Sequence, residues 1–123
     1  MNANAFDFLK AKSVHLNWRV RILGFLNGEH TLTKEQVVSH EHCDLGKWIY
    51  SEGLKKYGHF SEMVELERTH KLLHTAMEQV VHLKENNQIK EARNAYENMR
   101  EISENVIEML DFLYEIQKTH TYD

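Results

Sequence analysis

Two histidines four residues apart, His70 and His74, have the spacing best suited to binding a metal ion. At helical periodicity they share one face with apolar residues, namely Met63, Leu66, Leu73, Met77 and Val81. We expect that face to point into a core. Because the two imidazoles lie one turn apart on the same side of the helix, their ring nitrogens can converge on one ion. The alternative is a pair of neutral core histidines that hydrogen-bond to the backbone.

His15 and Cys43 could supply two further ligands of the same kind. His15 lies in the middle of an apolar arc, one heptad from Phe8 and one from Ile22. Cys43 comes at or just before the start of a predicted short helix, and the positive end of a helix stabilises a thiolate. Taken singly, a satisfied core histidine and a small buried hydrophobe are the simpler interpretations.

The four residues are more informative together than apart. Three imidazoles and one thiolate form a closed nitrogen and sulfur set that suits tetrahedral Zn²⁺. Burying three polar rings without partners costs on the order of several kcal/mol, and a shared metal removes that cost. Cys43 is the one member of the set that oxidants can modify, so it is the candidate redox-reactive residue. The predicted zinc ligands are His15, Cys43, His70 and His74.

Helices must position these residues. The chain of 123 residues has no proline and only five glycines, and it is rich in good helix formers. We predict one domain, residues 1–123, with an all-α, four-helix-bundle-like fold. It has three long helices plus a short helix that carries the Cys ligand. Their expected ranges are about 5–27, 44–52, 61–85 and 88–120.

Local signals predict where the helices begin and end. Asn27-Gly28 is expected to stop the first helix, Gly53 to stop the short one in a left-handed conformation, and Ser61 to cap the third. Residues 54–59 are expected to form a connector, and Thr33 with Gln36 resembles a helix start.

Apolar stripes predict which faces are buried. In the first helix one side carries Phe8, Ala11, Trp18, Ile22, Phe25 and Leu26, with Leu9, Leu16 and Leu23 beside them. So wide an arc predicts burial on more than one face, in a bundle or a dimer. The fourth helix carries a stripe without a polar residue at its centre: Ala92, Tyr96, Met99, Ile102, Val106, Met109 or Leu110, Leu113 and Ile116.

Composition excludes several functions. Fifteen basic and nineteen acidic residues give a net charge of −4 without a clustered basic stripe, so we expect no nucleic-acid binding. The apolar runs are too short to span a bilayer, so we expect no membrane insertion. The first residues do not resemble a secretory signal, and a single cysteine fits a reducing compartment, so a cytoplasmic location is expected.

Three blocks of the sequence resemble the chemoreceptor zinc-binding (CZB) domain family. They are His15-x-x-Trp18, Cys43-x-Leu45-Gly46-x-Trp48 and His70-x-x-x-His74. The two gaps between the blocks, of 24 and 21 residues, also suit that family. The resemblance implies that the two histidine blocks and Cys43 supply the zinc ligands. It implies packing around the site for four further residues, Trp18, Leu45, Gly46 and Trp48.

The resemblance also implies a role. Members of this family are all-helical, often homodimeric and cytosolic, and serve as sensory modules of chemoreceptors or diguanylate cyclases. Some respond to zinc or to oxidants such as hypochlorous acid through the zinc-bound cysteine. We therefore expect a zinc-binding sensory or regulatory domain in bacterial signalling, in chemotaxis or cyclic-di-GMP control. No signalling or catalytic domain accompanies it in this chain, so it is expected to be either a domain of a longer protein or a free-standing member. A free-standing member would act through a partner protein of those types or through a homodimer.

The sequence leaves two alternative functions open and predicts no catalysis. A structural zinc or zinc-buffering protein without a sensing role is the main alternative. A hemerythrin-like di-iron protein is a further one, because Glu67-x-x-His70 matches a di-iron half-site, although no second copy lies on a core face. Four protein ligands leave no open position for a catalytic water, and the chain has no phosphate loop or nucleophile elbow, so we expect no enzymatic activity.

Overall fold

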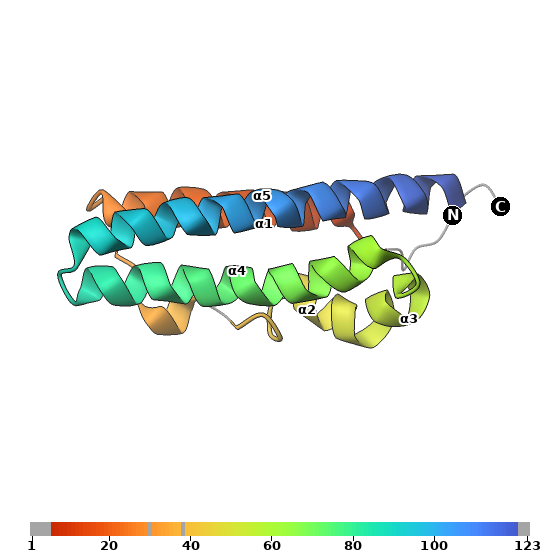
Figure 1. The fold of residues 1–123 in the computed structure, drawn as a ribbon, viewed down its shortest axis with the longest axis horizontal. Helices are drawn as coiled ribbons and strands as arrows, with labels where there is room; N and C mark the ends of the chain where they lie inside the picture. Colours follow the sequence, from red (N-terminus) through yellow and green to blue (C-terminus); the bar gives the residue numbers. More distant parts are fainter. Residues whose placement is uncertain (1–5, 30, 38, 121–123) are drawn as a thin grey trace.

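A computed structural model of the chain describes residues 6–29, 31–37 and 39–120 (Figure 1). These residues form helices and no strand, which confirms the all-α prediction. The long helices are α1 (Phe8–Leu26), α4 (Ser61–Glu85) and α5 (Ile89–His120). Between α1 and α4 lie four short elements, which are the 3₁₀ turn η1 (Lys34–Gln36), α2 (Asp44–Trp48), the π-helical turn η2 (Ile49–Gly53) and α3 (Leu54–Tyr57).

The three long helices lie lengthwise together (Figure 1). Helix α5 packs against both α1 and α4, and the short helices gather beside one end of α4. Polar contacts show that α1 and α5 are antiparallel. Lys12 Nζ lies 3.1 Å from a carboxylate oxygen of Asp111, and Arg19 Nε donates to Ser103 Oγ at 2.8 Å. In the described part of the chain no helix has the length and apolarity needed to cross a membrane.

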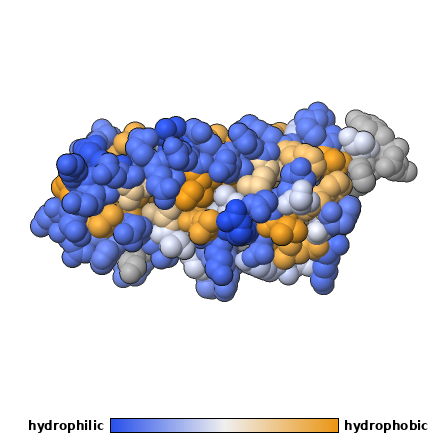
Figure 2. Space-filling view, in the orientation of Figure 1, coloured by the Kyte–Doolittle hydropathy of each residue, from blue (hydrophilic) through white to orange (hydrophobic). Residues whose placement is uncertain are grey.

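The core lies where the three long helices meet. The predicted faces of α1 and α4 are buried as expected, and every apolar member of the α4 face is at most 2% exposed. On the side shown in Figure 2 most of the surface is hydrophilic, and apolar side chains gather mainly between α5 and α4 and near α3. Helical periodicity alone therefore placed most of the core correctly.

One prediction about apolar stripes was wrong. The centre of the α5 core face does contain a polar residue, Ser103, which is buried and accepts a hydrogen bond from Arg19. On α1, Leu9, Leu16 and Leu23 are 51%, 38% and 39% exposed, because no helix in the described part of the chain packs against that side of α1, and their burial in a dimer stays a prediction. One chain therefore buries one face of α1 and leaves the other open.

The connection between α1 and α4 is more helical than predicted. Residues 54–57 form α3 rather than a connector, and Gly53 continues the helical run at φ −58° instead of ending it. A side chain at Gly53 would meet the ring of Trp48 at 2.8 Å, so this glycine provides space rather than a turn. Gly28 follows the end of α1, where a stop was predicted, and has a left-handed conformation with φ +78°. Ser61 is the first residue of α4, whereas Phe60 occupies the cap position.

Candidate metal centre

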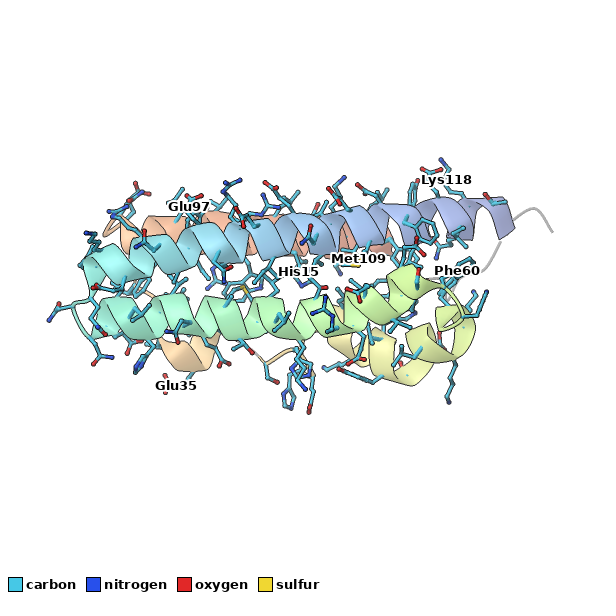
Figure 3. The ribbon with its side chains drawn as sticks, in the orientation of Figure 1. His15, Glu35, Phe60, Glu97, Met109 and Lys118 are labelled. Carbon is cyan, nitrogen blue, oxygen red and sulfur yellow. The ribbon has the colours of Figure 1, made fainter. Side chains whose placement is uncertain are left out.

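Four side chains from three separate parts of the fold meet in the core. His15 comes from α1, Cys43 from the residue before α2, and His70 and His74 from α4. One potential ligand atom from each lies within 4.8 Å of the others. All four residues are buried, with exposures of 1%, 8%, 0% and 2% in chain order. Figure 3 shows His15 in the interior of the bundle, between α5 and α4. The structure thus brings together the four residues predicted as zinc ligands.

The spacing of the donor atoms matches a tetrahedral zinc site. Nε2 of His70 lies 3.1 Å from Nε2 of His74, and Sγ of Cys43 lies 3.7 Å from Nε2 of His15. Zinc bonds of about 2.0 Å to nitrogen and about 2.3 Å to sulfur give tetrahedral edges of about 3.3 Å between nitrogens and about 3.5 Å between nitrogen and sulfur. Both observed separations fit these edges, so the residues present suit Zn²⁺.

The orientation of His15 is set by the backbone. Its Nδ1 lies 2.8 Å from the carbonyl oxygen of Ala11, one turn earlier in α1. If Nδ1 donates to that carbonyl, Nε2 carries no proton and its lone pair points toward Cys43. Such an outer hydrogen bond is typical of histidines that bind zinc. Sequence patterns could not single out Ala11, because its contribution is a main-chain oxygen.

Burial keeps the histidines in the form that binds metal. It lowers the pKa of His15, an effect that the hydrogen bond to Ala11 opposes in part. Burial also lowers the pKa of His70, together with the neighbouring His74, His15 and His40, to about 2. Both rings are therefore neutral at pH 7, as metal ligands must be. Nδ1 of His70 is buried without a hydrogen-bond partner, which adds to the cost of this pocket when it holds no ion.

The Cys43 thiol is not stabilised as a thiolate in the way that its position at a helix start predicts. It occupies the N-cap of α2, as predicted, and the backbone groups of Gly46 and Leu45 lower its pKa. Burial outweighs them, however, and the pKa of the Cys43 thiol is raised overall. In this pocket a bound cation is what would hold the sulfur as a thiolate.

The four predicted packing residues lie in different surroundings. Leu45 is buried. A Cβ at Gly46 would lie 1.6 Å from the carbonyl oxygen of His40, so only glycine fits beside the backbone there. Trp18 is buried with Arg21 over its ring at 4.4 Å. Trp48 is half-buried against an aromatic cluster, where it contacts Phe6, Phe8 and Tyr57.

Among the described residues, the remaining histidines lie outside the cluster. His42, His59 and His82 are exposed, whereas His40 is half-buried and close to Tyr50, with 6.0 Å between ring centres. His30 and the side chain of His120 fall outside the described part of the structure. Glu67, the candidate di-iron carboxylate, does not belong to the cluster and accepts a hydrogen bond from Tyr50 instead. The sequence alone does not indicate that Tyr50 and Glu67 form a pair.

Comparison with known proteins agrees with the geometry. The family model of the chemoreceptor zinc-binding domain (CZB) matches residues 15–81, which is more than half of the chain and includes all four clustered residues. No curated protein and no solved structure matches the chain. A buried cluster of three histidines and one cysteine, with separations that suit tetrahedral zinc, is what a zinc-binding domain requires. The chain belongs to the chemoreceptor zinc-binding domain family.

Proposed function

We propose that this protein is a cytoplasmic, non-enzymatic sensory domain of bacterial signalling that binds one zinc ion and responds to oxidants or zinc levels. Its output passes to a signalling protein of the chemoreceptor or diguanylate cyclase type. The observation that carries the proposal is the composition of the cluster, in which a single thiol completes a set of three imidazoles. Because protein atoms supply all four tetrahedral ligands, the site offers no position for a catalytic water.

The ligands join parts of the chain that are otherwise far apart in sequence. His15 belongs to α1, His70 and His74 to α4, and Cys43 to the stretch that leads into α2. When bound, zinc supplies the positive charge that keeps the Cys43 sulfur as a thiolate and links these elements. The three histidines lie on two long helices that pack into the core, whereas Cys43 lies on short elements. Cys43 is therefore the ligand whose loss can move one part of the fold and leave the rest in place.

Oxidation of Cys43 supplies the signal. Its thiolate sulfur attacks hypochlorous acid and is oxidised by two electrons to a sulfenic acid. The chlorine is reduced and leaves as chloride, and the hydroxyl oxygen ends on sulfur. Because a sulfenic acid would bind zinc more weakly than a thiolate, the stretch around Cys43 would then be released from the site. A bound partner can read this local change between two states.

Metal analysis during titration with hypochlorous acid tests this function. We expect about one zinc per chain, released or loosened in step with Cys43 oxidation, as measured by a colorimetric chelator and by mass spectrometry of the cysteine. The Cys43→Ala variant should bind zinc more weakly and lose the conformational response to oxidant. Zinc that stays bound while Cys43 remains unmodified would favour a structural or buffering role. Iron, or two metals per chain, would support the di-iron alternative.

We infer that the protein acts as a homodimer through the exposed side of α1. This side carries four apolar residues, which are Leu9, Leu16, Val20 and Leu23, with exposures of 38–64%. Helix α1 has four basic and no acidic residues, whereas α5 has seven acidic and four basic residues. In a two-fold dimer the basic α1 of one copy can therefore pack against the acidic α5 of the other. The partner that fits this surface is a second copy of the chain.

A single charge on α1 tests the dimer. Leu16→Glu places a carboxylate in the middle of the apolar side and should shift the protein from dimer to monomer in size-exclusion chromatography with light scattering. The matched control is Val64→Glu, which changes an apolar residue of α4 that is 50% exposed and should leave the dimer intact. A wild-type protein that is monomeric at all concentrations, or a Leu16→Glu dimer, would contradict the inference.

A further inference from the structure

Cys43 lies in a segment that is held at its far end by aromatic packing. This Cys43 segment, residues 39–57, includes α2, η2 and α3. Trp48, the last residue of α2, and Tyr57 of α3 pack with Phe8, at ring-centre distances of 5.1 and 6.4 Å. These contacts fix the segment to the start of α1. They do not join it to α4, the helix that carries His70 and His74.

A hydrogen bond between Tyr50 and Glu67 joins the segment to α4. The hydroxyl of Tyr50 donates to Oε2 of Glu67 at 2.9 Å. Glu67 lies on α4, three residues before His70, and Tyr50 lies seven residues after Cys43. The bond therefore joins η2, within the Cys43 segment, to the helical turn next to a histidine of the cluster.

Tyr50 also contacts the chain that precedes Cys43. Its ring packs against that of His40, with 6.0 Å between centres at an angle of 68°. The carbonyl of His40 in turn lies against Gly46 without room for a Cβ, so the stretch before Cys43 and the helix after it are in close contact. Partial burial and Glu67 raise the pKa of Tyr50 to about 12, so the hydroxyl keeps its proton and remains a donor at neutral pH.

We propose that Tyr50 and Glu67 form a latch that holds the Cys43 segment against α4 and sets how readily Cys43 leaves the cluster. Both are positioning residues, since neither belongs to the group of potential ligands. Loss of their bond frees the Cys43 segment from α4 and so exposes the buried sulfur to solvent and oxidant. The latch regulates the site of the proposed function, but it acts in the same way on the metal-free protein.

The reactivity of Cys43 toward a disulfide reagent measures the opening of the latch. The thiol is 8% exposed in the closed structure, so reaction with excess 5,5′-dithiobis(2-nitrobenzoate) requires local opening. In metal-free protein, Tyr50→Phe and Glu67→Ala should each react about fivefold faster than wild type, the effect of losing one hydrogen bond. Glu67→Gln keeps an acceptor oxygen and should restore a rate near wild type. Tyr96→Phe, the same change at a buried tyrosine of α5, is the matched control.

A double-mutant cycle separates a latch from two independent effects. The Tyr50→Phe, Glu67→Ala double variant should react no faster than either single variant, because each one already breaks the bond. Rates that multiply in the double variant, or single variants no faster than Tyr96→Phe, would overturn the latch. The zinc-loaded proteins should show the same order of rates for zinc transfer to a chelator. Failure to bind zinc would refute the proposed function alone, because the thiol reaction needs no metal.

Discussion

We expect His70→Ala to abolish zinc binding. This ring is completely buried and its Nε2 lies 3.1 Å from that of His74, so no other side chain can take its place without moving the core. Loss of an outer partner of a zinc ligand lowers affinity about 10- to 100-fold, and loss of the ligand itself should exceed that range. Isothermal titration of metal-free protein with zinc measures the change directly.

Thermal stability gives a second measure of the same substitution. A ligand at 1,000 times its dissociation constant stabilises the folded protein by about 4 kcal/mol. Zinc should therefore raise the melting temperature of wild type by many degrees and leave that of His70→Ala almost unchanged. His82→Ala is the matched control, because His82 lies exposed on the same helix. A His70→Ala protein that still binds zinc with wild-type affinity would show that the ligand set is wrong.

Mild acid is expected to destabilise the metal-free protein. In the folded state the pKa of His70 is lowered to about 2 and that of His15 is also lowered, in both cases mainly by burial. In the unfolded chain both return to about 6.5, so below this pH the unfolded state binds more protons. Stability from these neutral rings is complete above about pH 6.5 and is lost as the pH falls.

The size of this effect follows from the number of protons involved. His70 alone should remove about 1.4 kcal/mol of unfolding free energy per pH unit below pH 6.5, or about 2 kcal/mol by pH 5. His15 should add a similar loss of unfolding free energy per pH unit for as long as its ring stays neutral in the folded protein. Urea denaturation of metal-free protein between pH 7 and pH 5 measures the slope, which the His70→Ala variant should reduce. A stability that does not change over this range would show that the buried rings do not determine it.

Much of the site could be predicted because helical spacing is a local property. His70 and His74 lie one turn apart on a face that is otherwise apolar, so their convergence follows from the helix alone. The unusual position of His15 in an apolar arc was visible in the same way. The helix boundaries at Gly28, Asp44 and Glu85 also follow from residues next to them in the chain.

Contacts between distant parts of the chain could not be predicted in this way. Ser103 has a partner for its hydroxyl only because α5 runs antiparallel to α1 and brings Arg19 beside it. Leu16 remains exposed because no helix in the described residues covers its side of α1, a fact that an apolar pattern does not reveal. Likewise, Gly53 resembles a helix stop in sequence, and only its contact with Trp48 shows that it makes room for a ring.

The sequence by itself determined the helices, their buried faces and the kind of atoms available for a metal, because these depend on periodicity and side-chain chemistry. Tertiary structure decided how those atoms are arranged and how they ionise. It brings the Cys43 sulfur to 3.7 Å from His15, and burial there raises the pKa of the thiol although the residue caps a helix. It also joins Tyr50 to Glu67 across two elements. Distances and desolvation depend on packing in three dimensions, and residue spacing along one helix does not specify them.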